Sequence, residues 1–151
     1  MRTDEFVVRG QTPSTSGSNT EILSFSGLTP GYAYKIMEFS LYPKVPNTSY
    51  EITGTVTASR TAMDPEAVDF NDDGLIASSF ISDHAAEENP AGTFSVLNDT
   101  FLITQDLILA VEDNISGSSQ AVNWQCKFMP VKISGSEEAV ANYKQFLISD
   151  G

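Results

Sequence analysis

Residues 50–60 read YEITGTVTASR, a stretch in which apolar and polar side chains alternate. Successive side chains of a β-strand point to opposite sides of the sheet, so a period of two indicates a strand with one buried face. The many β-branched residues favour the same conformation. Residues 50–58 therefore predict a half-buried strand. One face would carry Tyr50, Ile52, Gly54, Val56 and Ala58, and the other would carry Glu51, Thr53, Thr55 and Thr57.

Three other apolar stretches read as strands, although each departs from strict alternation. Residues 100–111, TFLITQDLILAV, are almost continuously apolar, which is typical of a central strand covered on both faces. Residues 122–133, VNWQCKFMPVKI, contain Pro130, which requires an edge position or a bulge because proline has no N–H for the ladder. Residues 33–43, AYKIMEFSLYP, alternate less cleanly. These patterns would group Trp124, Cys126 and Phe128 on one face, Met37, Phe39 and Leu41 on another, and Ile36, Glu38 and Ser40 on the side opposite Met37.

Turn-forming sequences separate these stretches, among them NDDG at 71–74 and NPAG at 89–92. Seven or eight short strands at this spacing are typical of an antiparallel sandwich or barrel, and we expect an all-β, jelly-roll-like sandwich. A length of 151 residues fits one domain spanning residues 1–151. Residues 11–19, QTPSTSGSN, are small and polar, so the sequence predicts a polar N-terminal arm over residues 1–19.

The C-terminal stretch SGSEEAVANYKQFLI begins at Ser134 and has helical spacing. Ser134 or Ser136 would be the N-cap, and two glutamates follow where the helix dipole favours anions. We therefore expect one amphipathic helix over residues 136–148, which would lie on the sandwich or against a neighbouring subunit. Its apolar stripe would consist of Ala139, Val140, Tyr143, Phe146 and Leu147.

The charge of the chain limits the classes of partner. There are 20 acidic and 8 basic residues, for a net charge of -12, and residues 61–126 hold 12 of the acids and no Lys or Arg. Nucleic-acid binding needs cations that neutralise phosphates, so we do not expect it. No apolar run approaches the ~20 residues that span a bilayer. The single cysteine, Cys126, excludes an internal disulfide and a zinc site of paired thiolates, and its alternation with aromatic residues predicts a small buried core residue.

Residues 69–80, DFNDDGLIASSF, contain the most recognisable metal motif. Asp69, Asn71 and Asp73 match the first half of an EF-hand calcium loop, but the twelfth position, where that loop has a bidentate Glu, is Phe80. Alternatively, Asn and Asp side chains close Asx turns without any metal. We expect the metal-free turn and no cofactor, and calcium is the alternative. The residues behind the turn that we expect to enter the core are Ile76, Phe80 and Ile81.

Catalytic patterns are sparse. His84 is the only histidine, and Asp83 cannot orient it as the acid of a triad, because neighbouring side chains of an extended strand point apart. The sequence contains neither G-x-S-x-G nor H-E-x-x-H. A carboxylate pair of the kind that hydrolyses glycosides could form among 20 acids, but their number alone is no evidence for it. We therefore expect no enzymatic activity.

An acidic β-sandwich with Ser/Thr-rich strands, a polar arm and a C-terminal helix resembles jelly-roll-type structural proteins of virions. These are the capsid, decoration or spike subunits of bacteriophages and other viruses. The resemblance covers architecture and composition over most of the chain. It implies location in a virion and assembly as a homo-oligomer or with other virion proteins. Acidic faces would repel one another unless cations or a basic partner intervened. The interface candidates are Thr12, Pro13, Tyr143, Phe146 and Leu147.

Two hypotheses from other classes remain open. One is a calcium-dependent carbohydrate-binding or adhesion module, in which residues 69–73 would hold the ion beside an exposed aromatic residue such as Tyr32, Tyr42 or Trp124. The other is a glycoside hydrolase with two carboxylates that face each other across a cleft. A metal at 69–73 would favour the module, and a facing carboxylate pair would favour the hydrolase.

Overall fold

The computed structural model describes residues 5–14, 17–25, 31–58, 61–83, 92–115, 119–137, 139–141 and 144. Residues 135–137, 139–141 and 144 are helical and form a short C-terminal helix. Among the described residues, no helix is long and apolar enough to cross a membrane. Eight strands lie in this part of the chain: β1 (Phe6–Gln11), β2 (Asn19–Leu23), β3 (Tyr32–Pro43), β4 (Tyr50–Thr57), β5 (Leu75–Asp83), β6 (Gly92–Leu97), β7 (Leu107–Asp113) and β8 (Val122–Lys132).

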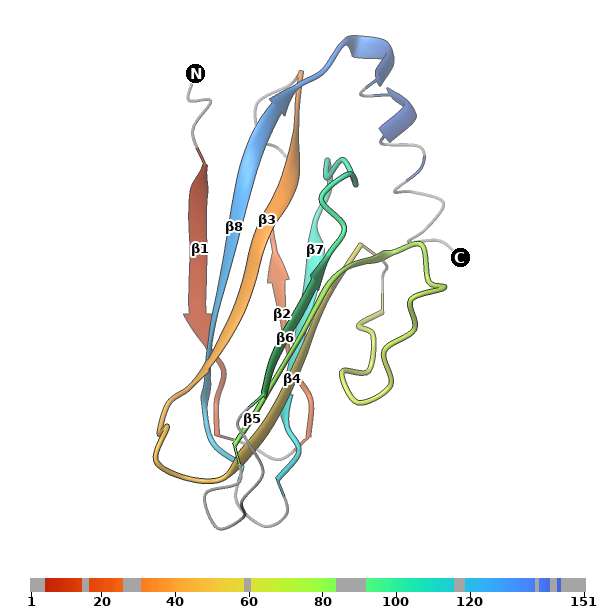
Figure 1. The fold of residues 1–151 in the computed structure, drawn as a ribbon. Coiled ribbons are helices and arrows are strands. Elements are labelled where there is room, and N and C mark those ends of the chain that lie inside the picture. The colour runs from red at the N-terminus through yellow and green to blue at the C-terminus, as the bar shows by residue number, and fades with distance from the viewer. Residues whose placement is uncertain are drawn as a thin grey trace.

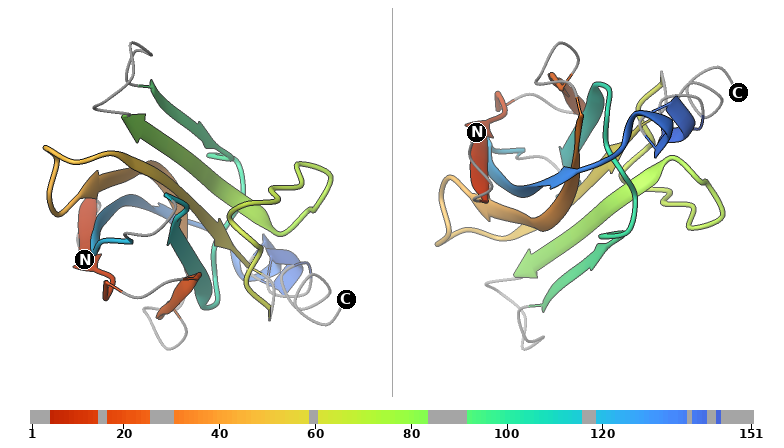
Figure 2. Two further views of the ribbon diagram at one scale, coloured as in Figure 1. Left: turned by 90° about the horizontal axis from the view of Figure 1, so that it is seen from below. Right: turned by 90° about the horizontal axis from the view of Figure 1, so that it is seen from above.

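The strands form two antiparallel sheets that pack face to face (Figure 1). The smaller sheet has the order β1-β8-β3, and the larger has the order β2-β7-β4-β5-β6. The views along the strands show β5 and β6, in green, at one side of the molecule and β1, in red, at another (Figure 2). Buried apolar residues of both sheets form one core, with Phe39 and Phe128 from the smaller sheet and Ile52 and Leu109 from the larger. The predicted all-β sandwich is confirmed.

The strands pair in a nested way. β1 pairs with β8, β2 with β7, and β4 with β5. A long hairpin that is rolled up in the jelly-roll manner has these pairs and would also pair β3 with β6. Here β6 pairs with β5 instead, but the Ser95 hydroxyl still donates a hydrogen bond to the carbonyl oxygen of Phe39, at 2.9 Å. The topology is therefore jelly-roll-like, with β6 attached to the larger sheet.

β4 follows its predicted alternation only in its first half. Ile52, Gly54 and Val56 are buried as expected, but Thr55 and Thr57 on the opposite face are fully buried as well. The Thr55 hydroxyl donates to the carbonyl oxygen of Met63, at 3.1 Å, so the segment that precedes β5 covers this face. The prediction of a half-buried strand is therefore wrong for residues 55–57. The alternation within the strand does not show that a segment outside it covers the second face.

β3 contains a β-bulge that changes which residues face the core. Its register against β8 shifts between Ile36 and Glu38, so Met37 is the extra residue. The shift turns Ile36 inward together with Phe39, and both are at most 1% exposed. The predicted grouping of Ile36 with Glu38 and Ser40 is wrong for this reason. A one-residue slip moves every following side chain to the other face.

The apolar stretch 100–111 forms two elements instead of one strand. Residues 101–104 bridge to the smaller sheet, where Tyr34 and Ile103 exchange backbone hydrogen bonds of 2.9 and 2.8 Å. The chain then enters the larger sheet as β7 at Leu107. β7 is a central strand between β2 and β4, as predicted, but it begins seven residues later than expected, because the polar residues 104–106 separate the two elements.

β8 is the central strand of the smaller sheet, and Pro130 in it faces Tyr34 of β3. Val122 accepts a 2.9 Å hydrogen bond from the N–H of Thr12, so the even-numbered residues of β8 direct their backbone groups toward β1. The described register with β1 ends where Phe6 faces Phe128, one alternation before Pro130. The missing N–H therefore removes no described ladder bond. Residues 1–4 are not described, so the edge position or bulge expected for Pro130 stays a prediction, whereas the burial of Trp124, Cys126 and Phe128 is confirmed.

The predicted N-terminal arm is wrong, because residues 6–11 are β1 and β2 already begins at Asn19. Phe6 packs against Tyr34 and Phe128, with ring centroids 5.6 and 5.8 Å apart. The hydroxyl of Thr12 accepts a 3.1 Å hydrogen bond from the N–H of Val122. The contacts of Phe6 with Phe128 and of Thr12 with Val122 join residues more than a hundred positions apart. The local polar composition could not predict them.

The C-terminal helix begins with a capping box. The N–H of Glu137 donates to the Ser134 hydroxyl at 3.2 Å, and the Glu137 carboxylate accepts from the N–H of Ser134 at 3.3 Å. Ser134 is therefore the N-cap, one of the two predicted positions. Ala141 is buried and Val140 is 68% exposed. The rest of the predicted helix, including Tyr143, Phe146 and Leu147, lies outside the described residues.

Candidate functional site

The acidic segment ahead of β5 is built from two Asx turns. The Asp69 carboxylate accepts the N–H of Asn71 at 2.9 Å, and the Asp72 carboxylate accepts the N–H of Gly74 at 2.8 Å. β5 runs from Leu75 to Asp83, past Phe80, where the second helix of an EF-hand would follow the loop, so this segment is not an EF-hand. Ile76 and Ile81 enter the core as predicted, but Phe80 does not. Calcium binding by Asp69, Asn71 and Asp73 stays an untested alternative.

Three other carboxylates come together on the outer face of the larger sheet. Asp64, Glu66 and Glu112 can each offer one oxygen within 4.8 Å of the others. Desolvation by burial, followed by repulsion from Glu66 and Asp64, raises the pKa of Glu112 above its ordinary value of 4.5. Sequence reasoning missed this cluster because Glu112 lies almost fifty residues from the other two. Asp64 and Glu66 are exposed, and the cluster lines none of the three cavities described below.

Large apolar side chains are exposed where β5 and β6 form one side of the larger sheet. Phe70, Phe94 and Val96 are 67%, 66% and 51% exposed, and Phe94 stacks on Phe80 at a centroid distance of 6.4 Å. We call these four residues the β6 edge surface. Residues 93–96 are all exposed, and among the described strands β6 pairs only with β5 in its sheet. Sequence reasoning did not single out this surface. The signal for it was the short alternating stretch TFSV, residues 93–96, between two turns.

Two cavities continue this surface toward the C-terminal helix. One, of about 410 Å³, is lined by Phe70, Val96, Phe101 and Lys144 together with Asp72 and Asp73. The other, of about 380 Å³, lies between residues 100–102 and the helix and shares Phe101 and Lys144 with the first. The Lys144 ammonium lies 5.5 Å from the centre of the Phe101 ring, which is a cation–π contact. Apolar and acidic side chains therefore surround a hollow beside the end of β6.

Of the predicted interface residues, the structure describes Thr12 and Pro13, which follow β1 of the smaller sheet. Thr12 is buried and is hydrogen-bonded within the chain, so its prediction as an interface residue is wrong. Pro13 is exposed next to it, at the end of β1. Tyr143, Phe146 and Leu147 lie outside the described residues, so their role stays a prediction. Only the helical residues near them, Val140 and Lys144, can be placed, and both line the second cavity.

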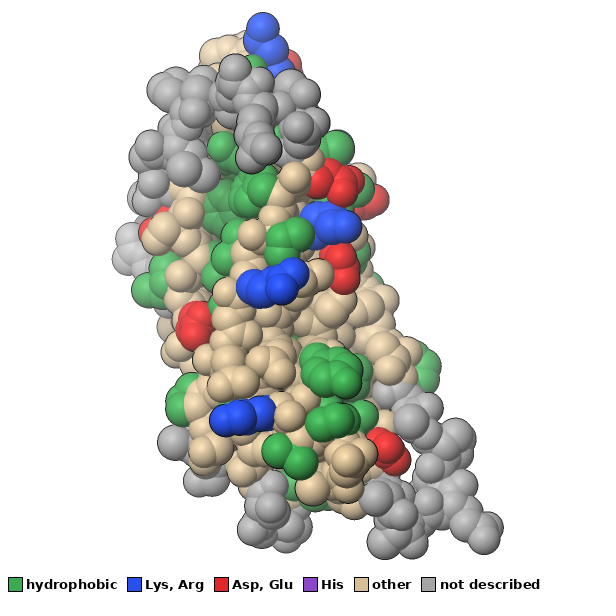
Figure 3. All heavy atoms as spheres, turned by 90° about the vertical axis from the view of Figure 1, so that its left-hand side faces the viewer, with side chains coloured by type: hydrophobic (Ala, Val, Ile, Leu, Met, Phe, Trp, Pro, Cys, Tyr) green, Lys and Arg blue, Asp and Glu red, His purple; other side chains and the backbone are tan. Residues whose placement is uncertain are grey.

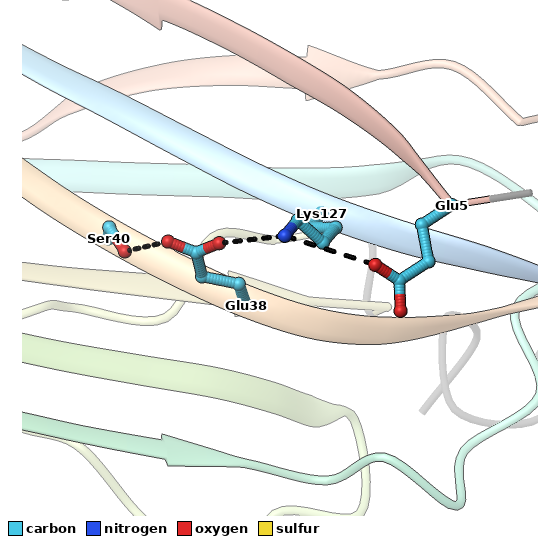
Figure 4. Close-up of polar contacts among 4 residues, drawn as sticks. All are labelled: Glu5, Glu38, Ser40 and Lys127. Atoms are coloured by element: carbon cyan, nitrogen blue, oxygen red, sulfur yellow. Dashed lines mark hydrogen bonds and ion pairs between the residues drawn. The ribbon is translucent and has the colours of Figure 1, made fainter.

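The outer face of the smaller sheet is polar, and Lys127 on it has carboxylate partners. Lys127 lies between Glu5, at 3.9 Å, and Glu38, at 3.7 Å, and the Ser40 hydroxyl donates to Glu38 at 2.7 Å (Figure 4). Figure 3, which looks onto this side of the molecule, shows basic and acidic side chains interspersed over a largely polar surface. At such exposure each ion pair contributes little to stability. The pairing instead balances the charge of Lys127 with nearby carboxylates.

A hollow of about 380 Å³ lies at one end of the same face. The strand register aligns Arg9 with Gln125 and Gln125 with Ser40, and it aligns Asn123 with Tyr42 in the next outward-facing row. These five side chains line the hollow, together with the intervening residues Gly10, Leu41 and Trp124. Tyr42 is 61% exposed, whereas the Trp124 side chain is buried in the core. The five polar side chains come from three strands and could not be grouped from the sequence.

The residues of the alternative calcium-dependent module are spread over the molecule. β3 leads into β4 through residues 44–49, so Tyr42 lies at the same end of the sandwich as Tyr50. The acidic segment precedes Leu75, which pairs with Thr57 at the other end of β4. Tyr42 and the segment 69–73 are therefore at opposite ends of the molecule, and Tyr32 is half-buried.

The remaining reactive groups offer little chemistry. Cys126 is fully buried, and burial raises the pKa of its thiol to about 12, so the thiolate that would act as a nucleophile is strongly disfavoured. The prediction that Cys126 is a core residue is confirmed. His84 lies outside the described residues. No protein-family model matches this chain, and no curated protein matches its sequence.

Proposed function

We propose that this chain is a structural subunit of a virion and that it assembles with copies of itself by pairing along β6. The β6 edge surface carries the proposal, because it combines exposed Phe94 and Val96 with a strand that ends its sheet. Edge strands usually avoid this combination, since an apolar edge with open backbone groups pairs readily with another chain. Contiguous exposed apolar surfaces of this kind mark interaction sites.

A second copy placed antiparallel to β6 would extend the five-stranded sheet across a twofold axis. Backbone hydrogen bonds would join the two β6 strands, and the side chains of Phe94 and Val96 would pack against those of the other copy. The interface would then be the same patch on both subunits. The jelly-roll-like pairing supports a virion location by analogy of fold, since capsid proteins use this architecture.

The acidic side chains at this surface affect how two copies can meet. Asp72 and Asp73 line the cavity beside Leu97, at the end of β6. In an antiparallel pair, the Leu97 end of one strand lies beside the Gly92 end of the other, so the two acidic turns are separated by the length of the strand. The remaining repulsion between two chains of net charge -12 is screened by salt. Self-association should therefore strengthen as the ionic strength rises.

Sedimentation velocity of the full chain over a concentration series tests this proposal. Val96→Lys places a charge on the edge and should weaken association at least about tenfold, since charged residues protect edge strands from pairing. Ile22→Lys is the matched control, because Ile22 is 68% exposed on β2, the other edge of the same sheet. The proposal is wrong if the chain stays monomeric at about 1 mM, the limit of weak affinity. It is also wrong if both variants weaken association equally.

A further inference from the structure

The hollow at the end of the smaller sheet is independent of the β6 edge surface and has its own chemistry. Its volume of about 380 Å³ is within the size range of small-molecule sites. The lining side chains stand in adjacent outward-facing rows, two residues apart along each strand, which is about 7 Å. A ligand about the size of one or two sugar rings would span both rows. The site is shaped by sheet register, so its side chains stand on rigid strands rather than on loops.

The hollow contains a cation that has no carboxylate partner among the described residues. Arg9 is exposed and makes no ion pair there, whereas the neighbouring Lys127 is held between Glu5 and Glu38. In a chain of net charge -12, an unpaired guanidinium in a hollow marks a place for an anion. Guanidinium groups bind carboxylates, as they do phosphates, through two parallel hydrogen bonds, so the carboxylate group of a ligand would fit Arg9.

The other lining groups suit the hydroxyl groups of a sugar. Asn123 accepts a 2.9 Å hydrogen bond from Gln11 through Oδ1, which leaves its N–H donors for a ligand. The Ser40 hydroxyl donates to Glu38, which leaves its oxygen as an acceptor. Gln125 offers both functions, and the exposed ring of Tyr42 offers an apolar face beside them. We propose that this hollow binds a saccharide that carries a carboxylate group.

Titration of the full-length, ¹⁵N-labelled chain followed by NMR tests the proposal. The probes are sialyllactose, which carries a carboxylate, lactose, which has no carboxylate, and sodium acetate, which has no sugar. Sialyllactose should shift the amide signals of Arg9, Tyr42 and Asn123, with a dissociation constant in the millimolar range. Lactose and acetate should each bind at least about tenfold more weakly, because each lacks half of the contacts.

Variants locate the binding and control for charge. Arg9→Gln and Tyr42→Ala should each weaken sialyllactose binding at least about tenfold, and their dispersed amide spectra show that they are folded. Lys132→Gln removes one positive charge from the other end of β8 and should leave the affinity unchanged. The proposal is overturned if sialyllactose gives no shifts at about 10 mM, or if acetate binds as tightly and the site is an adventitious anion site only. It is equally overturned if lactose binds as tightly, or if Lys132→Gln weakens binding as much as Arg9→Gln.

Discussion

β1 and β6 are both six-residue strands at the end of a sheet, but they have opposite relations to the core. β1 alternates between half-buried and exposed residues, and Phe6 on its inner face contacts the aromatic side chains of Tyr34 and Phe128. β6 exposes Phe94 and Val96 and contributes little to the core. An edge strand can thus complete a fold or remain open to a partner. Both strands pair with one neighbour, so pairing does not distinguish them. The contacts that each strand makes with the core decide which role it has.

The largest difference between the two strands is expected from truncation. Removing residues 1–11 deletes β1, uncovers β8 and removes Phe6 and Val8 from the core margin. We expect the cooperative thermal transition, followed by near-UV circular dichroism, to be lost. Removing residues 1–4 leaves β1 intact and is the control, with an unchanged transition. A cooperative transition after the longer deletion would mean that β1 is dispensable and that the contrast with β6 is false.

Substitution of two phenylalanines, one in the core and one on β6, compares their contributions to the free energy of unfolding. Phe128→Ala removes a fully buried ring and should lower the free energy of unfolding by about 3–5 kcal/mol. Phe94→Ala, at 66% exposure on β6, should change it by about 0.5 kcal/mol or less. Urea unfolding of both variants gives the two values. A large loss for Phe94→Ala would show that β6 is part of the stabilising core after all.

Asp113 on β7 tests whether buried polar contacts, in a part of the molecule remote from β6, also stabilise the fold. Its carboxylate accepts the N–H groups of Glu51, Ile115 and Gln120, at 3.3, 3.2 and 3.3 Å, and its side chain is buried. Asp113→Asn replaces one acceptor oxygen with a donor and should cost about 1–3 kcal/mol, because a buried N–H loses its partner. Asp99→Asn, at an exposed turn, is the control and should be nearly neutral. Equal unfolding energies for the two variants would contradict this role.

The smallest effect is expected at the carboxylate cluster on the outer face of the larger sheet. The pKa of Glu112 is raised in the fold, so the folded state favours the protonated form, and stability is lost as the pH rises through and above 4.5. Glu112→Gln should therefore raise the melting temperature slightly at neutral pH, and the gain should shrink as the pH falls toward 4.5. A gain that persists below that pH would point to a cause other than charge.

The candidate sites were less accessible to sequence reasoning than the fold. The motif from Asp69 to Gly74 is local, and its Asx turns form as the sequence predicts. The carboxylate cluster joins residues 64, 66 and 112, and the polar hollow joins residues 9, 40–42 and 123–125. Both depend on strand pairing over long separations. No local pattern encodes such pairing, because each strand shows only which face is apolar and not which strand lies beside it.

The sequence by itself determined the features that depend on neighbouring residues. Alternation specified strands such as β4, and Ser134 with Glu137 specified the helix start through a capping box. The tertiary structure alone decided the bulge at Met37 that buries Ile36, and the recruitment of residues 6–11 as a strand of the smaller sheet. The physical reason is that backbone conformation and side-chain alternation follow local sterics and hydrogen bonds. Register and edge position instead follow from which distant surfaces bury one another.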